Sequence, residues 1–163
     1  MKLLTTSLLV GTMIVAGQVN LRAQDKKNDR EDRIKSALTD KRYVFKATSA
    51  LPLRGRTIQL TSDYTLTVRG DTVIAFLPYF GRAYTAPLDP AKGGIDFTST
   101  DFDYKAKQRK KGNWEINIKP KDADDVRQLY LSFSASGFGN LQVTSLNRQT
   151  ISFNGHVNPT EEK

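Results

Sequence analysis

The sequence predicts an all-β fold, an antiparallel meander that closes into a small lipocalin-like β-barrel with one α-helix at the N-terminus. Three observations support this prediction. From residue 42 onward apolar residues alternate with polar ones in short runs, turn-forming residues separate the runs, and eight to ten such strands fit into about 115 residues. Alternation is typical of antiparallel strands with one face in the core and one in water. The spacing favours a barrel or a sandwich, so a two-sheet β-sandwich is the alternative.

The alternation is clearest in six runs. In each run every second residue is apolar, so one face of the predicted strand suits the core. The inward-facing residues are Tyr43, Phe45 and Ala47; Tyr64, Leu66 and Val68; Phe102, Tyr104 and Ala106; Trp114, Ile116 and Ile118; Leu129, Leu131, Phe133 and Ala135; and Ile151, Phe153 and Val157.

Turn residues between the runs predict consecutive hairpins, which favour a meander over a Greek key. Gly70 and Asp71 predict a tight hairpin, and residues 110–113 join the next clear pair of strands. Residues 137–140 and 147–148 are predicted to join the last three strands. A meander of this size avoids exposed edges by closing on itself.

The first 23 residues are typical of a secretory signal. Lys2 precedes an uncharged, mostly apolar run that ends at Ala16. This run is shorter than the roughly 20 residues that a transmembrane helix needs, so it matches the apolar region of a signal peptide. We prefer cleavage after Ala23 to the alternative after Gly17, because the strongly polar mature sequence begins there.

Residues 24–41 predict a polar segment followed by one short helix. Ile34, Ala37, Leu38 and Lys41 fall at positions i, i+3, i+4 and i+7, which gives a narrow stripe along one side of a helix. We expect this side to pack against the barrel domain, residues 42–157. Residues 158–163 are expected to form a disordered tail.

Composition excludes several classes of protein. The 163 residues suit a single domain. The absence of Cys excludes disulfides, zinc ribbons, iron–sulfur clusters and cysteine nucleophiles, and a single His excludes a multi-histidine metal centre.

Without Cys there is also no site for the lipid anchor of a bacterial lipoprotein. We therefore expect a soluble protein that is exported to the periplasm or the extracellular space. Loss of residues 1–23 removes two cations and no acid, so the net charge falls from +8 to +6.

Three longer stretches and two short motifs carry a family resemblance. They are Leu77-Pro78-Tyr79-Phe80-Gly81-Arg82-Ala83-Tyr84, Gly93-Gly94-Ile95-Asp96-Phe97, and Leu141-Gln142-Val143-Thr144-Ser145 with Ile151-Ser152-Phe153, together with Gly55-Arg56 and Trp114-Glu115-Ile116. In these features the chain resembles domain-of-unknown-function family 4251, small exported proteins of gut-dwelling Gram-negative anaerobes. The resemblance covers roughly residues 30–157. It implies export and a lipocalin-like barrel, and it supplies no activity and no catalytic residues.

One candidate binding site lies in the first of these stretches, at Tyr79, Phe80, Arg82 and Tyr84. In an extended segment Arg82 and Tyr84 point the same way. A guanidinium beside a phenol at the rim of an apolar barrel suits a carboxylate or phosphate head group. The alternative is that the aromatic residues cap the barrel and Arg82 pairs locally.

A second candidate site is a hairpin that gathers five cations, Lys105, Lys107, Arg109, Lys110 and Lys111. Three of them share one strand face, on which Asp101 and Asp103 also lie. The functional interpretation is contact with anionic lipid or polysaccharide. The alternative is a solvated hairpin whose lysines discourage edge-to-edge pairing.

No arrangement typical of catalysis is present in the sequence. Asp101 and Asp103 share their face with lysines, whereas a glycosidase pairs its acids across a sugar-binding cleft. No G-x-S-x-G elbow accompanies His156. The acidic residues 122–125 lack the later Gly and Glu of a calcium loop. We therefore expect that the protein is not an enzyme and that it binds neither a cofactor nor a metal ion.

Two functional hypotheses follow. The first is a non-enzymatic binding module for a small hydrophobic or lipid-like anionic ligand. The alternative is a structural or interaction protein of the cell envelope, with a packed barrel whose basic hairpin contacts anionic surfaces. Export disfavours nucleic acid as a partner, although a net charge of +8 alone would suit one.

Overall fold

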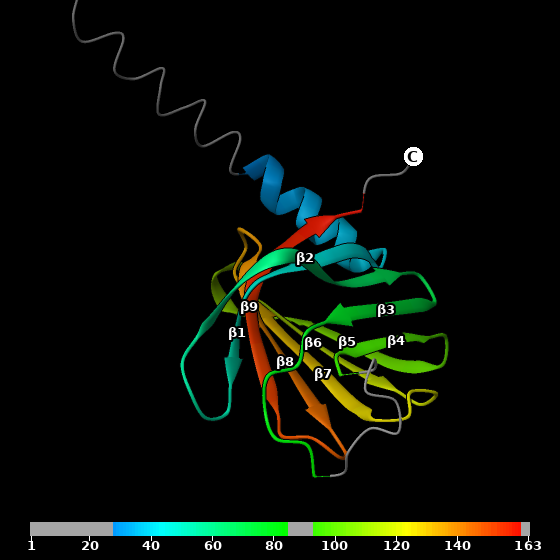
Figure 1. Cartoon of the computed structure of the whole chain (residues 1–163). Helices are drawn as coiled ribbons and strands as arrows, with labels where there is room; N and C mark the ends of the chain where they lie inside the picture. The colour runs from blue at the N-terminus through cyan, green and yellow to red at the C-terminus, as the bar shows by residue number, and fades with distance from the viewer. Residues whose placement is uncertain (1–27, 85–92, 161–163) are drawn as a thin grey trace, which may run out of the picture.

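One helix and nine antiparallel strands make up the part of the chain that this computed structural model describes, residues 28–84 and 93–160 (Figure 1). The helix covers residues 28–39. The strands are β1 (Arg42–Pro52), β2 (Ile58–Arg69), β3 (Thr72–Leu77), β4 (Ile95–Ser99), β5 (Phe102–Gln108), β6 (Trp114–Pro120), β7 (Val126–Phe133), β8 (Phe138–Ser145) and β9 (Ile151–Pro159), and a 3-10 turn, η2 (Lys110–Gly112), links β5 to β6.

The predicted signal, residues 1–23, lies outside the described residues. Within the described ranges, no helix is both long enough and apolar enough to cross a membrane.

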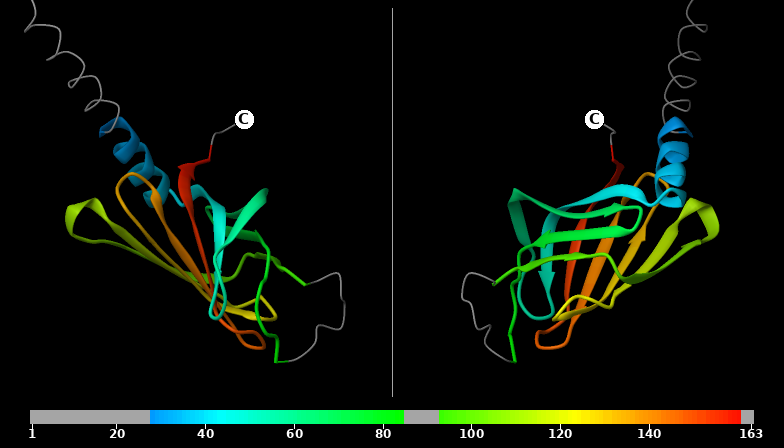
Figure 2. Two further views of the ribbon diagram at one scale, coloured as in Figure 1. Left: turned by 60° about the vertical axis from the view of Figure 1, so that its left-hand side comes forward. Right: turned by 90° about the vertical axis from the view of Figure 1, so that its right-hand side faces the viewer.

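The strands form one sheet in the order β4-β3-β2-β1-β9-β8-β7-β6-β5. Each strand pairs with the next along the chain except β4 with β5, and β1 pairs with β9. The sheet therefore curls into a nearly closed barrel (Figures 1 and 2). This confirms the predicted all-β meander barrel with one N-terminal helix. Its open side lies between β4 and β5, which follow each other across Thr100 and Asp101 without pairing.

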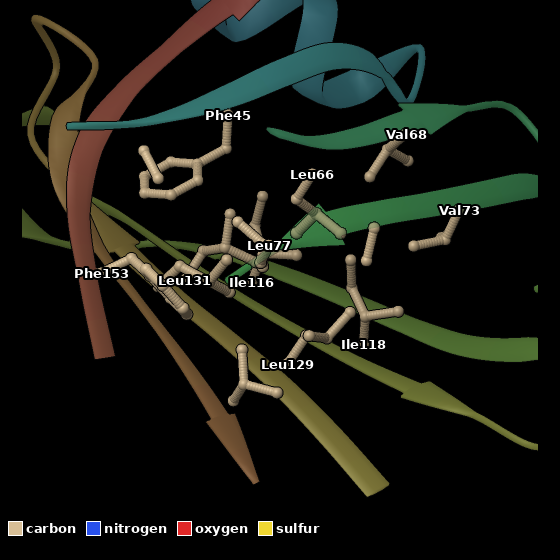
Figure 3. Close-up of a cluster of buried hydrophobic side chains, with 14 of the residues drawn as sticks. Phe45, Leu66, Val68, Val73, Leu77, Ile116, Ile118, Leu129, Leu131 and Phe153 are labelled. Carbon is tan, nitrogen blue, oxygen red and sulfur yellow. The ribbon is translucent and has the colours of Figure 1, made fainter. Parts of the chain in front are cut away.

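Inward-facing side chains fill the barrel. In Figure 3, Phe45, Leu66 and Leu77 from one wall face Leu131 and Phe153 from the other. All five are at most 2% exposed. A barrel of about eight strands has an interior just wide enough for side chains to fill, and each fully buried side chain of this kind stabilises the fold by about 1.5–3 kcal/mol.

The helix closes one end of the barrel with the predicted apolar stripe (Figure 2). Ile34, Ala37 and Leu38 are buried. The prediction that Lys41 continues the stripe is wrong. The helix ends at residue 39, and Lys41 adopts a left-handed backbone with φ of 53° just before β1 begins.

The turn between β7 and β8 lies three residues earlier than predicted. It occupies residues 134–137, with Gly137 at φ of +85°, and Phe138, Gly139 and Asn140 belong to β8. A side chain at Gly139 would clash with the backbone of Ser132 across the ladder, so this glycine serves close strand pairing and not the turn. At the other end of the domain, β9 runs to Pro159, two residues into the segment expected to be a disordered tail.

The inward and outward assignment of β7 is testable with neighbouring residues. Leu131→Ala is expected to lower the free energy of unfolding by about 2–5 kcal/mol, because it leaves a cavity in the core. Ser132 is exposed, so Ser132→Ala is expected to change it by less than about 0.5 kcal/mol. Urea unfolding followed by the fluorescence of Trp114 measures both. Equal losses in the two variants would contradict the assignment.

Candidate functional site

The segment after β3 turns back on itself around Tyr79. The Tyr79 hydroxyl donates a shared hydrogen bond to the carbonyl oxygens of Arg82 at 2.9 Å and Gln149 at 3.1 Å. A Cβ at Gly81 would lie 2.7 Å from this hydroxyl, so any side chain here would have to displace the Tyr79 hydroxyl. Burial raises the pKa of Tyr79, although Gln149 and Arg148 act in the opposite direction.

The same segment is docked on the loop between β8 and β9 by its backbone. The amide of Tyr84 donates to the carbonyl of Asn147 at 2.7 Å, and the amide of Gln149 donates to the carbonyl of Arg82 at 3.1 Å. Ala83 and Arg148 form an isolated antiparallel bridge. These bonds hold together two connections that lie more than 60 residues apart in the sequence.

An ion pair between Arg148 and Asp125 lies at the centre of this region. Arg148 Nε is 2.6 Å from Asp125 Oδ2, and the two side chains are only 16% and 20% exposed. The Arg148 guanidinium also donates to the carbonyls of Gly93 at 3.2 Å and Gly94 at 2.8 Å, and lies 5.0 Å from the centre of the Tyr79 ring. We call these five residues the Arg148 cluster. It ties three connections together at the end of the barrel opposite the helix (Figures 1 and 2).

The environment of Asp125 favours its charged form. Burial alone would raise the pKa of Asp125. The amide of Asn147, which donates to Oδ1 at 3.0 Å, and the guanidinium of Arg148 outweigh it and hold the pKa below its usual value. The cluster is therefore an ion pair at neutral pH.

The structure separates the four residues of the first candidate site. Tyr79 belongs to the Arg148 cluster, and Phe80 packs against the core. Arg82 and Tyr84 are exposed, Tyr84 by 71%. Arg82 forms no ion pair with any other described residue. The segment thus places two of its members in the fold and two in solvent.

The second candidate site, the basic hairpin of β5, η2 and β6, reaches beyond the neighbouring strands in both views of Figure 2. Arg109 pairs with Glu115 at 2.6 Å, and this bond holds the pKa of Glu115 below its usual value. Asp101 and Asp103 pair with Lys121 at 3.5 and 3.0 Å.

The acids near the hairpin are therefore already engaged. Four lysines form no ion pair among the described residues, and they are Lys105, Lys107, Lys110 and Lys111. Lys107 nevertheless contributes to lowering the pKa of Glu115. Lys105 lies opposite Asn117 and Lys107 opposite Glu115 in the ladder, on the outer face as predicted. Lys110 and Lys111 form the tip.

The predicted polar turn before β7 includes a carboxylate that caps the β4–β5 connection. Asp122 Oδ2 accepts hydrogen bonds from the amides of Thr100 at 2.9 Å and Asp101 at 3.1 Å. A hydrogen bond from Ser99 and these amides lower the pKa of Asp122 to about 2. Among the described residues, no group of three or more potential metal ligands is found.

Two tyrosines inside the barrel form a polar pair that the sequence did not reveal. The hydroxyls of Tyr43 on β1 and Tyr104 on β5 are buried, and neither has a hydrogen-bond partner within the described structure. The two hydroxyls are close enough for each to shift the pKa of the other. Burial raises the pKa of Tyr43 well above its usual value, and the Tyr104 hydroxyl raises it further. The Lys41 ammonium lies 5.1 Å from the centre of the Tyr104 ring.

The nine-stranded antiparallel meander, the helix across one end and the Arg148 cluster at the other define a class of small, nearly closed β-barrels. A family described as a domain of unknown function, DUF4251, matches residues 25–157. The chain belongs to this family.

A solved structure shows the same fold. The crystal structure of a DUF4251 family protein from Bacteroides eggerthii DSM 20697 superposes with a TM-score of 0.59 at 18% sequence identity, over 80% of this chain and 87% of that chain. None of the curated proteins matches this chain.

The Arg148 cluster is expected to contribute to stability. Arg148→Met leaves Asp125 without its partner, and breaking a buried ion pair costs about 3–5 kcal/mol. We expect a loss near the lower end of that range, because both side chains keep a little exposure. The matched control is Lys46→Met, which breaks the exposed pair with Asp63 and is expected to cost less than about 1 kcal/mol. Urea unfolding measures both, and a loss in the control as large as that of Arg148→Met would contradict the assignment.

Proposed function

We propose that the chain is an exported, non-enzymatic interaction protein whose basic hairpin contacts an anionic polymer or surface of the cell envelope. The unneutralised lysines of the hairpin carry this proposal. Residues 101–121 hold seven Lys or Arg and three Asp or Glu, a net +4 that is half of the chain's formal +8. The three acids are paired with Arg109 and Lys121, so the remaining charge is available to a partner.

The shape of the hairpin supports this role. It extends from the barrel (Figure 2), so its lysines can approach a surface without the barrel in the way. Several like charges on one projection produce a field that attracts anions and is screened over about 10 Å at 0.1 M salt. Binding is therefore expected to weaken as salt rises.

The packed interior supports a scaffold function for the barrel. Side chains from both walls meet in the middle (Figure 3), and the helix and the Arg148 cluster cover its ends. The sequence led to two hypotheses, a ligand-binding module and an interaction protein. The packed interior favours the interaction protein. The signal-like residues 1–23 support export.

Removing four lysines of the hairpin tests the proposal. Lys105→Gln, Lys107→Gln, Lys110→Gln and Lys111→Gln together are expected to weaken binding to heparin or to phosphatidylglycerol vesicles at least tenfold, since each cation near an anionic surface contributes about 1 kcal/mol. The control variant loses four exposed cations outside β5 to β9, through Arg30→Gln, Lys35→Gln, Arg54→Gln and Arg56→Gln. Co-sedimentation and heparin-column elution measure the effect. An equal loss in both variants would mean that only net charge matters.

A second candidate function, binding of a small ligand inside the barrel, is favoured by one observation. The Tyr43 and Tyr104 hydroxyls are buried without partners, and an unpaired buried polar group costs about 1–3 kcal/mol. A ligand with a hydrogen-bond acceptor that enters between the unpaired edges of β4 and β5 would relieve this cost.

Native mass spectrometry of the protein from its own host tests the second candidate. The expected result is an additional bound mass that Tyr43→Phe weakens and that Tyr130→Phe, on the outer face, leaves unchanged. In the ligand-free protein, Tyr43→Phe is expected to raise the free energy of unfolding by about 1 kcal/mol, because it removes an unpartnered hydroxyl. Clean apo protein in repeated preparations would exclude this function.

A further inference from the structure

The outer face of β7, β8 and β9, beside the basic hairpin, is largely polar and carries no acid, and Phe138 at one end of β8 is its large exposed apolar side chain. From Val126 to Thr160, which spans these strands and their connections, the chain has no Asp or Glu, and its seven Asn or Gln and eight Ser or Thr lie partly on this face and partly in the connections. A solvated sheet face ordinarily mixes both signs of charge. This face instead offers amides and hydroxyls, each of which can donate and accept hydrogen bonds.

The strand register arranges these side chains in rows. One row crosses five strands from β5 to β9, and its members are Lys105, Asn117, Tyr130, Gln142 and Ser152. A parallel row begins at Lys107 and continues through Glu115, Ser132, Asn140 and Asn154. At about 4.8 Å between strands, each row is about 19 Å long. We call the two rows together the amide face.

Hydrogen bonding on the amide face is incomplete. Asn140 Nδ2 donates to Asn154 Oδ1 at 3.2 Å, which orients both amides. Asn117 Oδ1 is buried and has no partner in the described part of the chain. Buried polar atoms are ordinarily satisfied, so an oxygen of this kind in the middle of a polar row is suited to a donor from outside, such as a hydroxyl.

The amide face and the hairpin form one continuous surface, because Lys105 and Lys107 are the first members of the two rows. The only acid in either row, Glu115, is neutralised by Arg109. A partner that covers both parts must carry negative charge at one end and many hydroxyl groups along its length.

We infer that this surface binds an anionic polysaccharide chain, which runs from the hairpin lysines across the amide face. The inference rests on the proposed function of the hairpin and names its partner class. Sugar hydroxyls match the amides, and the half-buried Tyr130 in the centre offers an aromatic surface to a sugar ring. A lipid surface fits less well, because the hairpin tip, residues 108–113, has no apolar side chain to insert, whereas interfacial anchors bury apolar area.

The experiment compares three anionic probes on the full mature chain: heparin, polyphosphate as a polyanion without sugar, and phosphatidylglycerol vesicles. The test variant is Asn117→Ala with Gln142→Ala, which flanks Tyr130 and changes no charge. Gln59→Ala with Asn28→Ala removes two exposed amides outside β5 to β9 and is the matched control. The expected result is a loss of heparin affinity of about fivefold or more in the test variant alone, with polyphosphate affinity unchanged.

Each other outcome counts against the inference. Unchanged heparin affinity in the test variant, equal losses for heparin and polyphosphate, or wild-type binding to vesicles but not to heparin would overturn it and leave the hairpin proposal standing. If the four-lysine variant binds all three probes like wild type, the proposed function itself fails. Thermal unfolding checks the fold, and the single variant Gln142→Ala, at an exposed position, replaces the double variant if that one unfolds.

Discussion

The packing of inward-facing side chains is the interaction on which the rest of this structure depends. Strands have a period of two, so a slip of one residue in register would move a whole row of core residues into solvent. Leu66, Leu131 and Phe153 are completely buried, and each lies on a different strand. Their common interior sets the register of the ladders between them. The outer residues are then placed as a consequence, including the amide face and the lysines of β5.

The two ends of the barrel are closed by different kinds of interaction. At one end the helix contributes Ile34 and Leu38, which bury apolar surface. At the other end, Arg148 and Asp125 form an ion pair that is largely buried. Burial of these two charges is tolerated because carbonyl and amide groups of the backbone also hydrogen-bond to both side chains. The helix end is tolerant of similar apolar residues, whereas the ion-pair end depends on the exact side chains.

The elements of this fold could be predicted from sequence because their signals are local. Alternation predicted six of the nine strands and most of their inward-facing residues, although Ala106 is exposed and Ala135 lies in a turn, and Gly70 predicted a hairpin. Prediction failed where a local signal had two explanations: Gly139 suggested a turn but serves the close approach of β8 to β7. The curling of the meander could be predicted from the need to protect strand edges. No feature of the sequence predicted that β4 and β5 would remain unpaired.

The candidate sites were predictable to different degrees. The lysines of the hairpin lie within seven residues of one another in the sequence, so their clustering was evident. Arg148 and Asp125 are 23 residues apart, and each resembles an ordinary turn residue. Tyr43 and Tyr104 were predicted only as inward-facing strand residues, with no indication that their hydroxyls would be neighbours. Contacts of this kind depend on how the sheet curls, which a pattern of residues along the chain does not contain.

The position of β9 has a consequence for the order in which the chain can fold. Without β9, the sheet order leaves two separate four-stranded meanders, β4 to β1 and β8 to β5, joined by only two residues, 100 and 101. β9, which is made after the other eight described strands, is thus the one that unites them, by pairing with β1 on one side and β8 on the other. Because these contacts span most of the sequence, barrel closure carries a high entropic cost and is expected to be slow. A growing chain is therefore held as two incomplete halves until β9 has been made.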